Sequence, residues 1–222
     1  MSDSADEFER QKSDLELREA IHDGLPKLAD LTPGRTGNLS LRSGDRVGIT
    51  PSGIPYADIE ESDIPILSIE GSQLEGERDP SSETPMHLGI YRALDIKSLV
   101  HVHAPWSTTL AVLGEELPPV HYMLAAAGGT VPLAPYAPFG TSELAEKAVS
   151  AMTDSETKAC LLANHGLIAG GTDVVDAVET TIAVESTARL YIQARAVGDP
   201  VELSESQVAN AVDQFDSYGQ SN

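Results

Sequence analysis

Two histidines stand two residues apart in the segment SLVHVHAPWSTTL, which runs from Ser98 to Leu110. Residues i and i+2 of a strand point to the same face, so His101 and His103 are expected to project side by side. A third imidazole, His165, is available in ANHG, where it follows a predicted strand and precedes a glycine. Three neutral imidazoles suit Zn²⁺ and leave a fourth position for water, a carboxylate or a substrate. A structural pair of histidines, one buried and one exposed, fits the HxH spacing equally well.

A carboxylate and two serines precede a predicted helix. Ser81, Ser82 and Glu83 come just before apolar spacing that runs to about Leu94, and Ser82 is the expected N-cap. Serine hydroxyls and the free N–H groups of a helix start form a neutral anion site. An ordinary N-cap with an acidic first turn explains one serine and the glutamate, but not the second serine. Beside a metal, Glu83 would serve as a fourth ligand or as a general base.

Small and polar residues also gather in two loops between predicted strands. These are Gly37 with Asn38, and Ser52 with Gly53 in the segment TPSG. Either segment alone is most often just a turn. Together with the two serines before the helix, they could line one phosphate cradle of hydroxyls, amides and backbone N–H groups. Such a cradle would hold an anion without any lysine.

Predicted strands and helices alternate along the chain, which indicates the α/β class. Strands are expected over residues 39–50 as a hairpin, 64–71, 97–103, 158–163 and in LIAGG, and helices over 16–31, 82–94, 106–114, 142–153, 172–197 and 204–218. Residues 1–14 are acidic and are predicted to be disordered. Residues 15–222 are predicted to form a single domain.

The chain of 222 residues carries 35 acidic and 14 basic side chains, for a formal net charge of -21. This charge excludes a general electrostatic attraction to nucleic acid or to an anionic membrane surface. A dispersed acidic surface with few lysines is typical of proteins that stay soluble in very high salt, where the Debye length falls to roughly 3 Å. We interpret the composition as a halophilic signature, with an ordinary acidic cytosolic protein as the alternative.

The single cysteine, Cys160, excludes an intrachain disulfide, and its apolar neighbours predict a buried, unreactive thiol. The N-terminal segment has no apolar signal core. The longest uncharged stretch, residues 121–142, is interrupted by prolines and glycines. These features predict a cytoplasmic protein with no membrane span.

Six segments occur in order along the chain: TGNLSLR, ITPSGIPY, SSETPMHLGIYRAL, LVHVHAPWST, HYMLAAAGGTVPLAPYAPFGT and ANHGLIAGG. In this order they resemble the class II aldolase/adducin head family, over residues 34–218. The resemblance implies a three-layer α/β/α sandwich around a mostly antiparallel sheet. It also implies a small phosphorylated sugar as the substrate, and a cyclic homotetramer with active sites between subunits.

The resemblance also implies roles for individual residues. The implied ligands of one Zn²⁺ per subunit are His101, His103, His165 and Glu83. Glu83 would leave the metal when substrate binds and then act as the base. Tyr122 in HYM is the implied proton donor at the aldehyde oxygen, and Tyr218 would enter from a neighbouring subunit. The implied phosphate contacts are Asn38, Ser52, Gly53, Ser81 and Ser82.

The implied reaction cleaves a ketose 1-phosphate, such as L-fuculose 1-phosphate, to dihydroxyacetone phosphate and an aldehyde such as L-lactaldehyde, through a zinc-stabilised enediolate. No lysine Schiff base is required. Glu83 favours an aldolase over the 4-epimerases of the family, which usually carry aspartate at this position. Rhamnulose- and ribulose-phosphate aldolases, dehydratases and decarboxylases stay open. A non-catalytic adducin-type interaction module is the alternative of a different class, and the presence of all four ligands argues against it.

Overall fold

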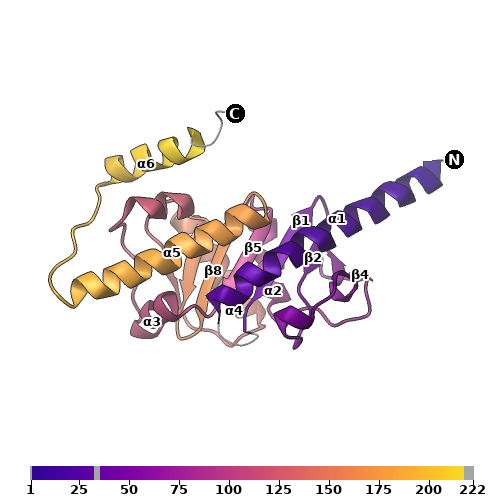
Figure 1. The fold of residues 1–222 in the computed structure, drawn as a ribbon, viewed down its shortest axis with the longest axis horizontal. Coiled ribbons are helices and arrows are strands. Elements are labelled where there is room, and N and C mark those ends of the chain that lie inside the picture. The colour runs from indigo at the N-terminus through magenta and orange to yellow at the C-terminus, as the bar shows by residue number, and fades with distance from the viewer. Residues whose placement is uncertain (1, 33–35, 218–222) are drawn as a thin grey trace.

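A computed structural model describes residues 2–32 and 36–217, and an eight-stranded sheet lies at its centre (Figure 1). The strand order is β4-β3-β2-β1-β5-β8-β7-β6, and each neighbouring pair is antiparallel except β6 with β7. The strands are β1 (Asn38–Ser43), β2 (Arg46–Ile49), β3 (Ile66–Ser68), β4 (Gln73–Glu75), β5 (Ser98–Val102), β6 (Leu133–Ala134), β7 (Ala159–Leu162) and β8 (Gly166–Gly171). The expected mostly antiparallel sheet is confirmed.

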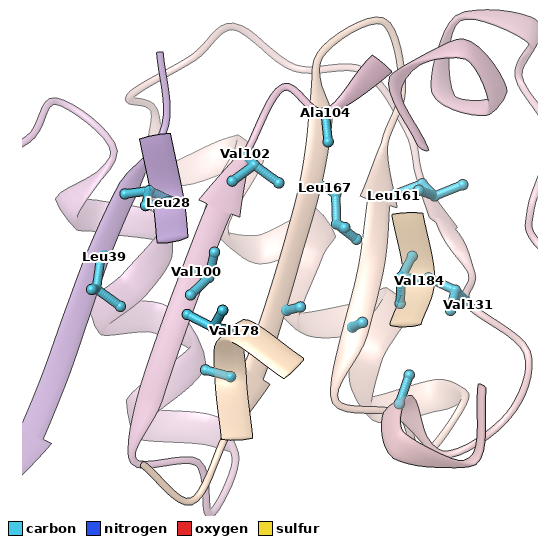
Figure 2. Close-up of a cluster of buried hydrophobic side chains, with 14 of the residues drawn as sticks. Leu28, Leu39, Val100, Val102, Ala104, Val131, Leu161, Leu167, Val178 and Val184 are labelled. Carbon is cyan, nitrogen blue, oxygen red and sulfur yellow. The ribbon is translucent and has the colours of Figure 1, made fainter. Parts of the chain in front are cut away.

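Helices cover both faces of this sheet and complete three layers. One face carries α1 (Ser2–Leu31), α3 (Pro105–Leu113) and α5 (Val174–Arg195), and the other carries α2 (Thr84–Ala93) and α4 (Ser142–Asp154). Each face has its own apolar core. Figure 2 shows the core under α1 and α5, where Leu28, Val178 and Val184 pack with Leu39 and Val100 of the sheet. Burial of these aliphatic side chains is the main stabilising term, and the predicted α/β/α sandwich is confirmed.

Three short 3₁₀ helices and a last α-helix lie outside this frame. They are η1 (Tyr56–Asp58), η2 (Glu61–Asp63), η3 (Tyr122–Ala127) and α6 (Glu205–Ser217). After α5 the chain runs back in an extended segment, and α6 comes to lie against η3 (Figure 1). The ring of Tyr122 stacks on that of Phe215, with centroids 6.2 Å apart, which ties the two helices together.

Strand β5 is buried on both faces, and its alternation decides where the histidines point. Val100 and Val102 face the core under α1 and α5, whereas Leu99 faces the core under α2 and α4. His101 shares the face of Leu99, because side chains alternate along a strand. Its register partner across β1 is Asn38, which therefore shares that face too. The site is built at this end of β1 and β5, beneath the start of α2.

Helix α1 begins at Ser2 and takes in the acidic N-terminal segment. The carboxylate of Asp14, 4% exposed, accepts two hydrogen bonds from the guanidinium of Arg46 on β2, at 2.5 and 2.6 Å. Further along, Leu17 and Ile21 of the same helix are buried. Helical spacing of these anchors, rather than the acidic composition, decides the conformation of the segment.

Element boundaries differ from the sequence predictions in two informative places. Helix α2 begins at Thr84 with Glu83 as its N-cap, and no side chain makes the cap hydrogen bond, so Ser82 is not the N-cap. The sequence does not predict strand β4, and all three of its residues are exposed.

Cys160 is fully buried, and burial raises the pKa of its thiol above the usual range. None of the described helices is both long enough and apolar enough to cross a bilayer.

Candidate metal centre and active site

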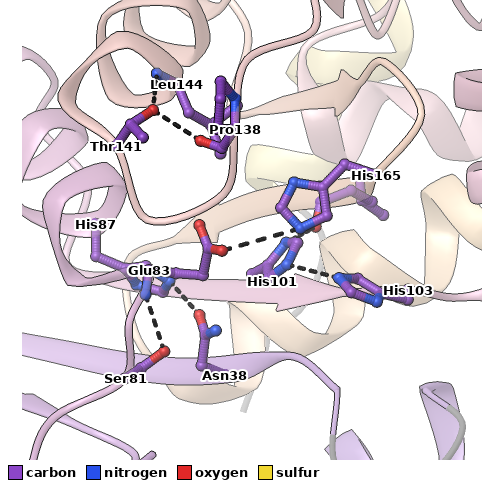
Figure 3. Close-up of polar contacts among 11 residues, drawn as sticks. Asn38, Ser81, Glu83, His87, His101, His103, Pro138, Thr141, Leu144 and His165 are labelled. Carbon is purple, nitrogen blue, oxygen red and sulfur yellow. Dashed lines mark hydrogen bonds and ion pairs between the residues drawn. The ribbon is translucent and has the colours of Figure 1, made fainter.

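Three imidazoles converge at the end of β5 (Figure 3). The Nε2 atoms of His101 and His103 are 3.1 Å apart. His165 completes the group: each pair of rings is edge-to-face, with centroids 4.8 to 4.9 Å apart. One ligand nitrogen from each ring lies within 4.8 Å of the other two. The structure thus brings together the three histidines that the sequence singled out.

A backbone contact decides which nitrogen His101 offers. Its Nδ1 lies 2.9 Å from the carbonyl oxygen of Leu167, so Nδ1 carries the proton and Nε2 presents its lone pair to the cluster. Burial lowers the pKa of His101 and His103, and burial with the neighbouring His103 lowers that of His165 to about 4. The three rings are therefore neutral near pH 7, the state in which imidazole binds a metal.

The turn between β7 and β8 presents His165. Asn164 adopts a left-handed conformation, with φ of 55°, which asparagine tolerates better than most residues. Gly166 follows, where a Cβ would meet the carbonyl oxygen of Val102 at 2.5 Å and the His103 ring at 3.0 Å. The glycine therefore permits the close approach of β8 to β5 that packs the imidazoles together.

Glu83 brings a carboxylate to the same cluster from the start of α2. Its side chain is 7% exposed, and its Oε1 lies 4.0 Å from Nε2 of His165 (Figure 3). Burial raises the pKa of the carboxyl group, and a hydrogen bond from the backbone of Gly140 opposes that shift. The other oxygen, Oε2, is buried and has no hydrogen-bond partner among the described residues. A group in this position is suited to exchange a proton or bind a cation.

The loop before α4 closes over Glu83. Gly140 has φ of 71°, and a Cβ there would meet the carbonyl oxygen of Ser82 at 2.9 Å. Thr141 fixes the end of this loop: its hydroxyl donates to the carbonyl of Pro138 at 2.7 Å and accepts from the N–H of Leu144 at 3.2 Å (Figure 3). The loop therefore shields the carboxylate from water and keeps it desolvated.

The donor set fits a divalent cation. Three imidazole nitrogens converge, the Glu83 carboxylate lies 4.0 Å from one of them, and no described Lys or Arg side chain lies against that carboxylate to neutralise it. A buried carboxylate without a partner is costly, and a cation between it and the imidazoles removes that cost. The three histidines are therefore the residues that would hold the ion, and the carboxylate of Glu83 lies beside them.

Two loops beside the metal centre are tied to each other by the backbone. The N–H of Ser52 donates to the carbonyl of Asp79 at 2.9 Å, and the N–H of Ser81 donates to that of Thr50 at 3.1 Å. The loop after β2 thus lies alongside the serines that precede α2. The Ser81 hydroxyl also accepts from the backbone N–H of Glu83 at 3.2 Å, which holds the serine against the start of α2.

A cavity of about 420 Å³ is lined by the three histidines, by Glu83 and by both of these loops. Its lining includes each predicted phosphate residue and each predicted metal ligand: Asn38, Ser52, Gly53, Ser81, Ser82, Glu83, His101, His103 and His165. None of the described lining residues is Lys or Arg. Apart from Glu83 and the histidines, the polar groups of the wall are hydroxyls, side-chain amides and backbone. Tyr56, Tyr136 and Phe139 also line it, although nothing in their local sequence marked them in advance.

Of the two predicted tyrosines, the structure describes Tyr122, which does not line this cavity in the single chain. Tyr122 is 57% exposed and lines a separate hollow with Phe215 and its neighbours on α6. Tyr218 lies outside the described residues.

Comparisons with known proteins agree with the site. Residues 25–192 match the family described as the class II aldolase and adducin N-terminal domain. A 5-deoxy-D-ribulose 1-phosphate aldolase of Bacillus thuringiensis serovar kurstaki is 45% identical over 193 residues, 86% of this chain and 90% of that protein. A 5-methylthioribulose-1-phosphate/5-deoxyribulose-1-phosphate aldolase of Rhodospirillum rubrum is 39% identical over 211 residues, 93% and 94% of the two chains.

A solved structure resembles the fold closely. An L-fuculose 1-phosphate aldolase superimposes with a TM-score of 0.87 at 41% identity, over 90% of this chain and 96% of that one. The chain therefore belongs to the class II aldolase and adducin N-terminal domain family, and it is a metal-dependent aldehyde-lyase of that family.

Proposed function

We propose that the chain is a zinc-dependent aldolase that cleaves a ketose 1-phosphate to dihydroxyacetone phosphate and an aldehyde. The observation that carries the proposal is the position of Glu83 in the same cavity as three converging imidazoles. Its Oε1 lies 4.0 Å from Nε2 of His165, and its buried Oε2 has no partner among the described residues. Three nitrogens and one carboxylate oxygen form a donor set that suits Zn²⁺. When bound, the ion supplies Lewis-acid stabilisation of the negative charge that develops on the substrate's carbonyl oxygen.

Glu83 is proposed to move the proton at the reacting carbon. In cleavage, the bond between C3 and C4 of the ketose breaks, and its electron pair moves into the three-carbon fragment. Glu83 then donates a proton to that fragment and so yields dihydroxyacetone phosphate. In condensation the same carboxylate removes this proton. Burial raises the pKa of Glu83, which brings it closer to neutral pH and suits both roles.

The neutral cradle is proposed to hold the phosphate. Its candidates are Asn38, Ser52, Gly53, Ser81 and Ser82, which line one side of the cavity. Hydroxyl, amide and backbone N–H groups bind a phosphate without adding net charge. The phosphate of the ketose would therefore fix the substrate with its carbonyl end toward the histidines and its other end free to vary.

The aldehyde is proposed to carry an apolar end. Ala137 and the aromatic rings of Tyr136 and Phe139 line the cavity, and Phe139 is 70% exposed at its rim. These groups suit a terminal methyl or methylthio group better than a second charge. L-fuculose 1-phosphate, which releases L-lactaldehyde, and 5-deoxyribulose 1-phosphate, which releases acetaldehyde, both meet this condition. The relatives that are named for 5-deoxyribulose 1-phosphate support the second substrate.

A homotetramer with active sites between subunits is proposed as the working form. The cavity of one chain lacks Tyr122, and the exposure of this ring leaves it available to another subunit. In such an assembly Tyr122 would exchange the proton at the aldehyde oxygen, and Tyr218 would approach from a neighbouring chain.

A coupled assay tests the proposal. The protein is supplied separately with 5-deoxyribulose 1-phosphate, L-fuculose 1-phosphate, L-rhamnulose 1-phosphate and L-ribulose 1-phosphate in multimolar KCl, and dihydroxyacetone phosphate is followed with and without a chelator. Chelator-sensitive release from one of them identifies the aldehyde. No release from any of them, with metal bound, would overturn the aldolase proposal in favour of an epimerase, a dehydratase or a decarboxylase.

A further inference from the structure

A chain of hydrogen-bonded, buried polar side chains runs from Tyr91 on α2 to Asn38, one of the proposed phosphate contacts. The hydroxyls of Tyr91 and Ser40 are 2.6 Å apart, and the Ser40 hydroxyl is 2.7 Å from Nδ1 of His87. Nε2 of His87 then lies 2.5 Å from Oδ1 of Asn38 (Figure 3). The four side chains are between 0% and 4% exposed, so their hydrogen bonds face almost no competition from water.

The direction of the hydrogen bonds in this chain follows from Asn38, the residue at its end. The Oδ1 atom of Asn38 can only accept, so Nε2 of His87 carries a hydrogen and donates it. In the neutral ring Nδ1 is then an acceptor, so the Ser40 hydroxyl donates to it. The Ser40 oxygen in turn accepts from the Tyr91 hydroxyl.

A separate contact agrees with this direction. The backbone of Leu99 also hydrogen-bonds the Tyr91 oxygen. If every donation were reversed, the Tyr91 oxygen would receive hydrogens from both Ser40 and Leu99, and its own hydrogen would need another acceptor. The direction that ends with Asn38 accepting uses each group once and needs no further partner.

We infer that His87 is a positioning residue, which holds the Asn38 amide with its NH₂ group toward the phosphate. The oxygen of the amide is engaged by His87, and Asn38 also lines the cavity, so the NH₂ group is the part left for a ligand. A flipped amide would present its oxygen to an anion and repel it. The inference rests on the proposed function in one respect, which is that the ligand of the cradle is a phosphate.

The geometry of His87 suggests a matched pair of variants. The amide of glutamine can place an NH₂ group near the position of Nε2, whereas the shorter amide of asparagine reaches only the position of Nδ1. H87Q therefore retains a donor toward Asn38, and H87N loses it. Val184→Ala removes two methyl groups from the core on the opposite face of the sheet, and serves as a control for a loss of stability alone.

The test measures binding of inorganic phosphate to the metal-loaded protein by calorimetry. We expect H87N to bind phosphate about tenfold more weakly than the unmodified protein, which corresponds to the loss of a hydrogen bond to a charged group. H87Q should recover most of that affinity, and V184A should change it less than twofold. The double variant N38A/H87N should bind no more weakly than N38A, because His87 acts through Asn38.

Three results would overturn the inference: unchanged phosphate affinity in H87N, an equal loss in H87N and H87Q, or additive losses in the double variant. If H87N does not fold, Ser40→Ala takes its place, with an expected loss of about threefold from a less firmly held ring. With an active substrate, the inference further predicts a rise in KM of about tenfold for H87N, with kcat changed less than threefold. Phosphate binding is measured without turnover, so this test stands even if the aldolase proposal fails.

Discussion

At the scale of single residues, Glu83 is a buried carboxylate with no Lys or Arg against it among the described residues, whereas the buried carboxylate of Asp14 is paired with Arg46. Solvation by water is what normally keeps a carboxylate ionised, and here it is replaced by three neutral imidazoles and one backbone hydrogen bond. The carboxylate is thus poised between two partners, a cation and a proton. Both partners are needed for an aldolase that uses a metal.

Replacing Glu83 by glutamine tests its role as proton carrier. Glutamine has the same shape and cannot take up a proton from carbon, so E83Q should retain the fold and the metal. Turnover should fall by about 10²–10⁴-fold, the usual contribution of a general acid–base group. Steady-state rates and metal analysis measure the two effects. Glu143→Gln, at an exposed pair with Lys147, is the control, and undiminished turnover in E83Q would remove Glu83 from the mechanism.

Replacing His101 by alanine tests the metal ligands. This histidine is 1% exposed, and its ring is oriented by Leu167, so its loss removes a pre-positioned donor. We expect H101A to lose the bound metal, measured as equivalents of metal per chain after dialysis. His121→Ala is the control and should keep it, since His121 serves as the N-cap of η3. Retention of one equivalent by H101A would show that the ligand assignment is wrong.

The metal ligands could be predicted from the sequence because their signals are local. Strand periodicity puts His101 and His103 on one face, and a strand end followed by glycine presents His165. The link from His87 to Asn38 could not be predicted in the same way. His87 stands four residues after Glu83 on its helix, but its partner lies 49 residues away on β1, and only the packing of α2 against the sheet brings them together.

At the scale of elements, the attachment of α1 depends on a contact that composition does not reveal. Its first half is rich in charge, and one charged residue of that half, Asp14, is among its anchors. A buried pair with Arg46, 32 residues away, cannot be recognised without the fold. The start of α2 shows the same limit: Ser82 fits the N-cap by type, but Glu83 occupies that position.

Replacing Asp14 by asparagine tests the attachment of α1 to β2. D14N leaves the Arg46 guanidinium with an uncharged and incomplete partner, so the free energy of unfolding should fall by about 1–3 kcal/mol. Urea denaturation measures the change. Glu16→Gln removes an exposed pair with Lys12 and should cost less than about 0.5 kcal/mol. Equal stabilities for D14N and the unmodified protein would mean that the pair does not hold the helix in place.

At the scale of the whole molecule, the net charge of -21 is the dominant feature. Charges of one sign repel each other in the compact state, and salt screens that repulsion because the Debye length falls from about 10 Å at 0.1 M to about 3 Å at 1 M. The interpretation of this composition as halophilic stays a prediction, and it has a direct physical consequence.

The consequence is a salt-dependent stability. Between 0.1 and 2 M KCl the free energy of unfolding should rise by on the order of 1 kcal/mol, or about 2–4 °C in Tm. Thermal unfolding followed by circular dichroism measures it, with NaCl at equal ionic strength as the control for a specific potassium effect. A Tm that stays constant or falls across this range contradicts the interpretation.

The most direct test of the central claim follows hydrogen exchange on dihydroxyacetone phosphate in D₂O, because it needs no knowledge of the aldehyde. If Glu83 moves a proton at the reacting carbon beside a metal, the metal-loaded protein should exchange one of the two hydrogens at the hydroxymethyl carbon, as seen by proton NMR. E83Q and the chelated protein should not exchange it. The account is contradicted if the metal-loaded protein leaves both hydrogens in place, or if E83Q exchanges one as fast as the unmodified protein.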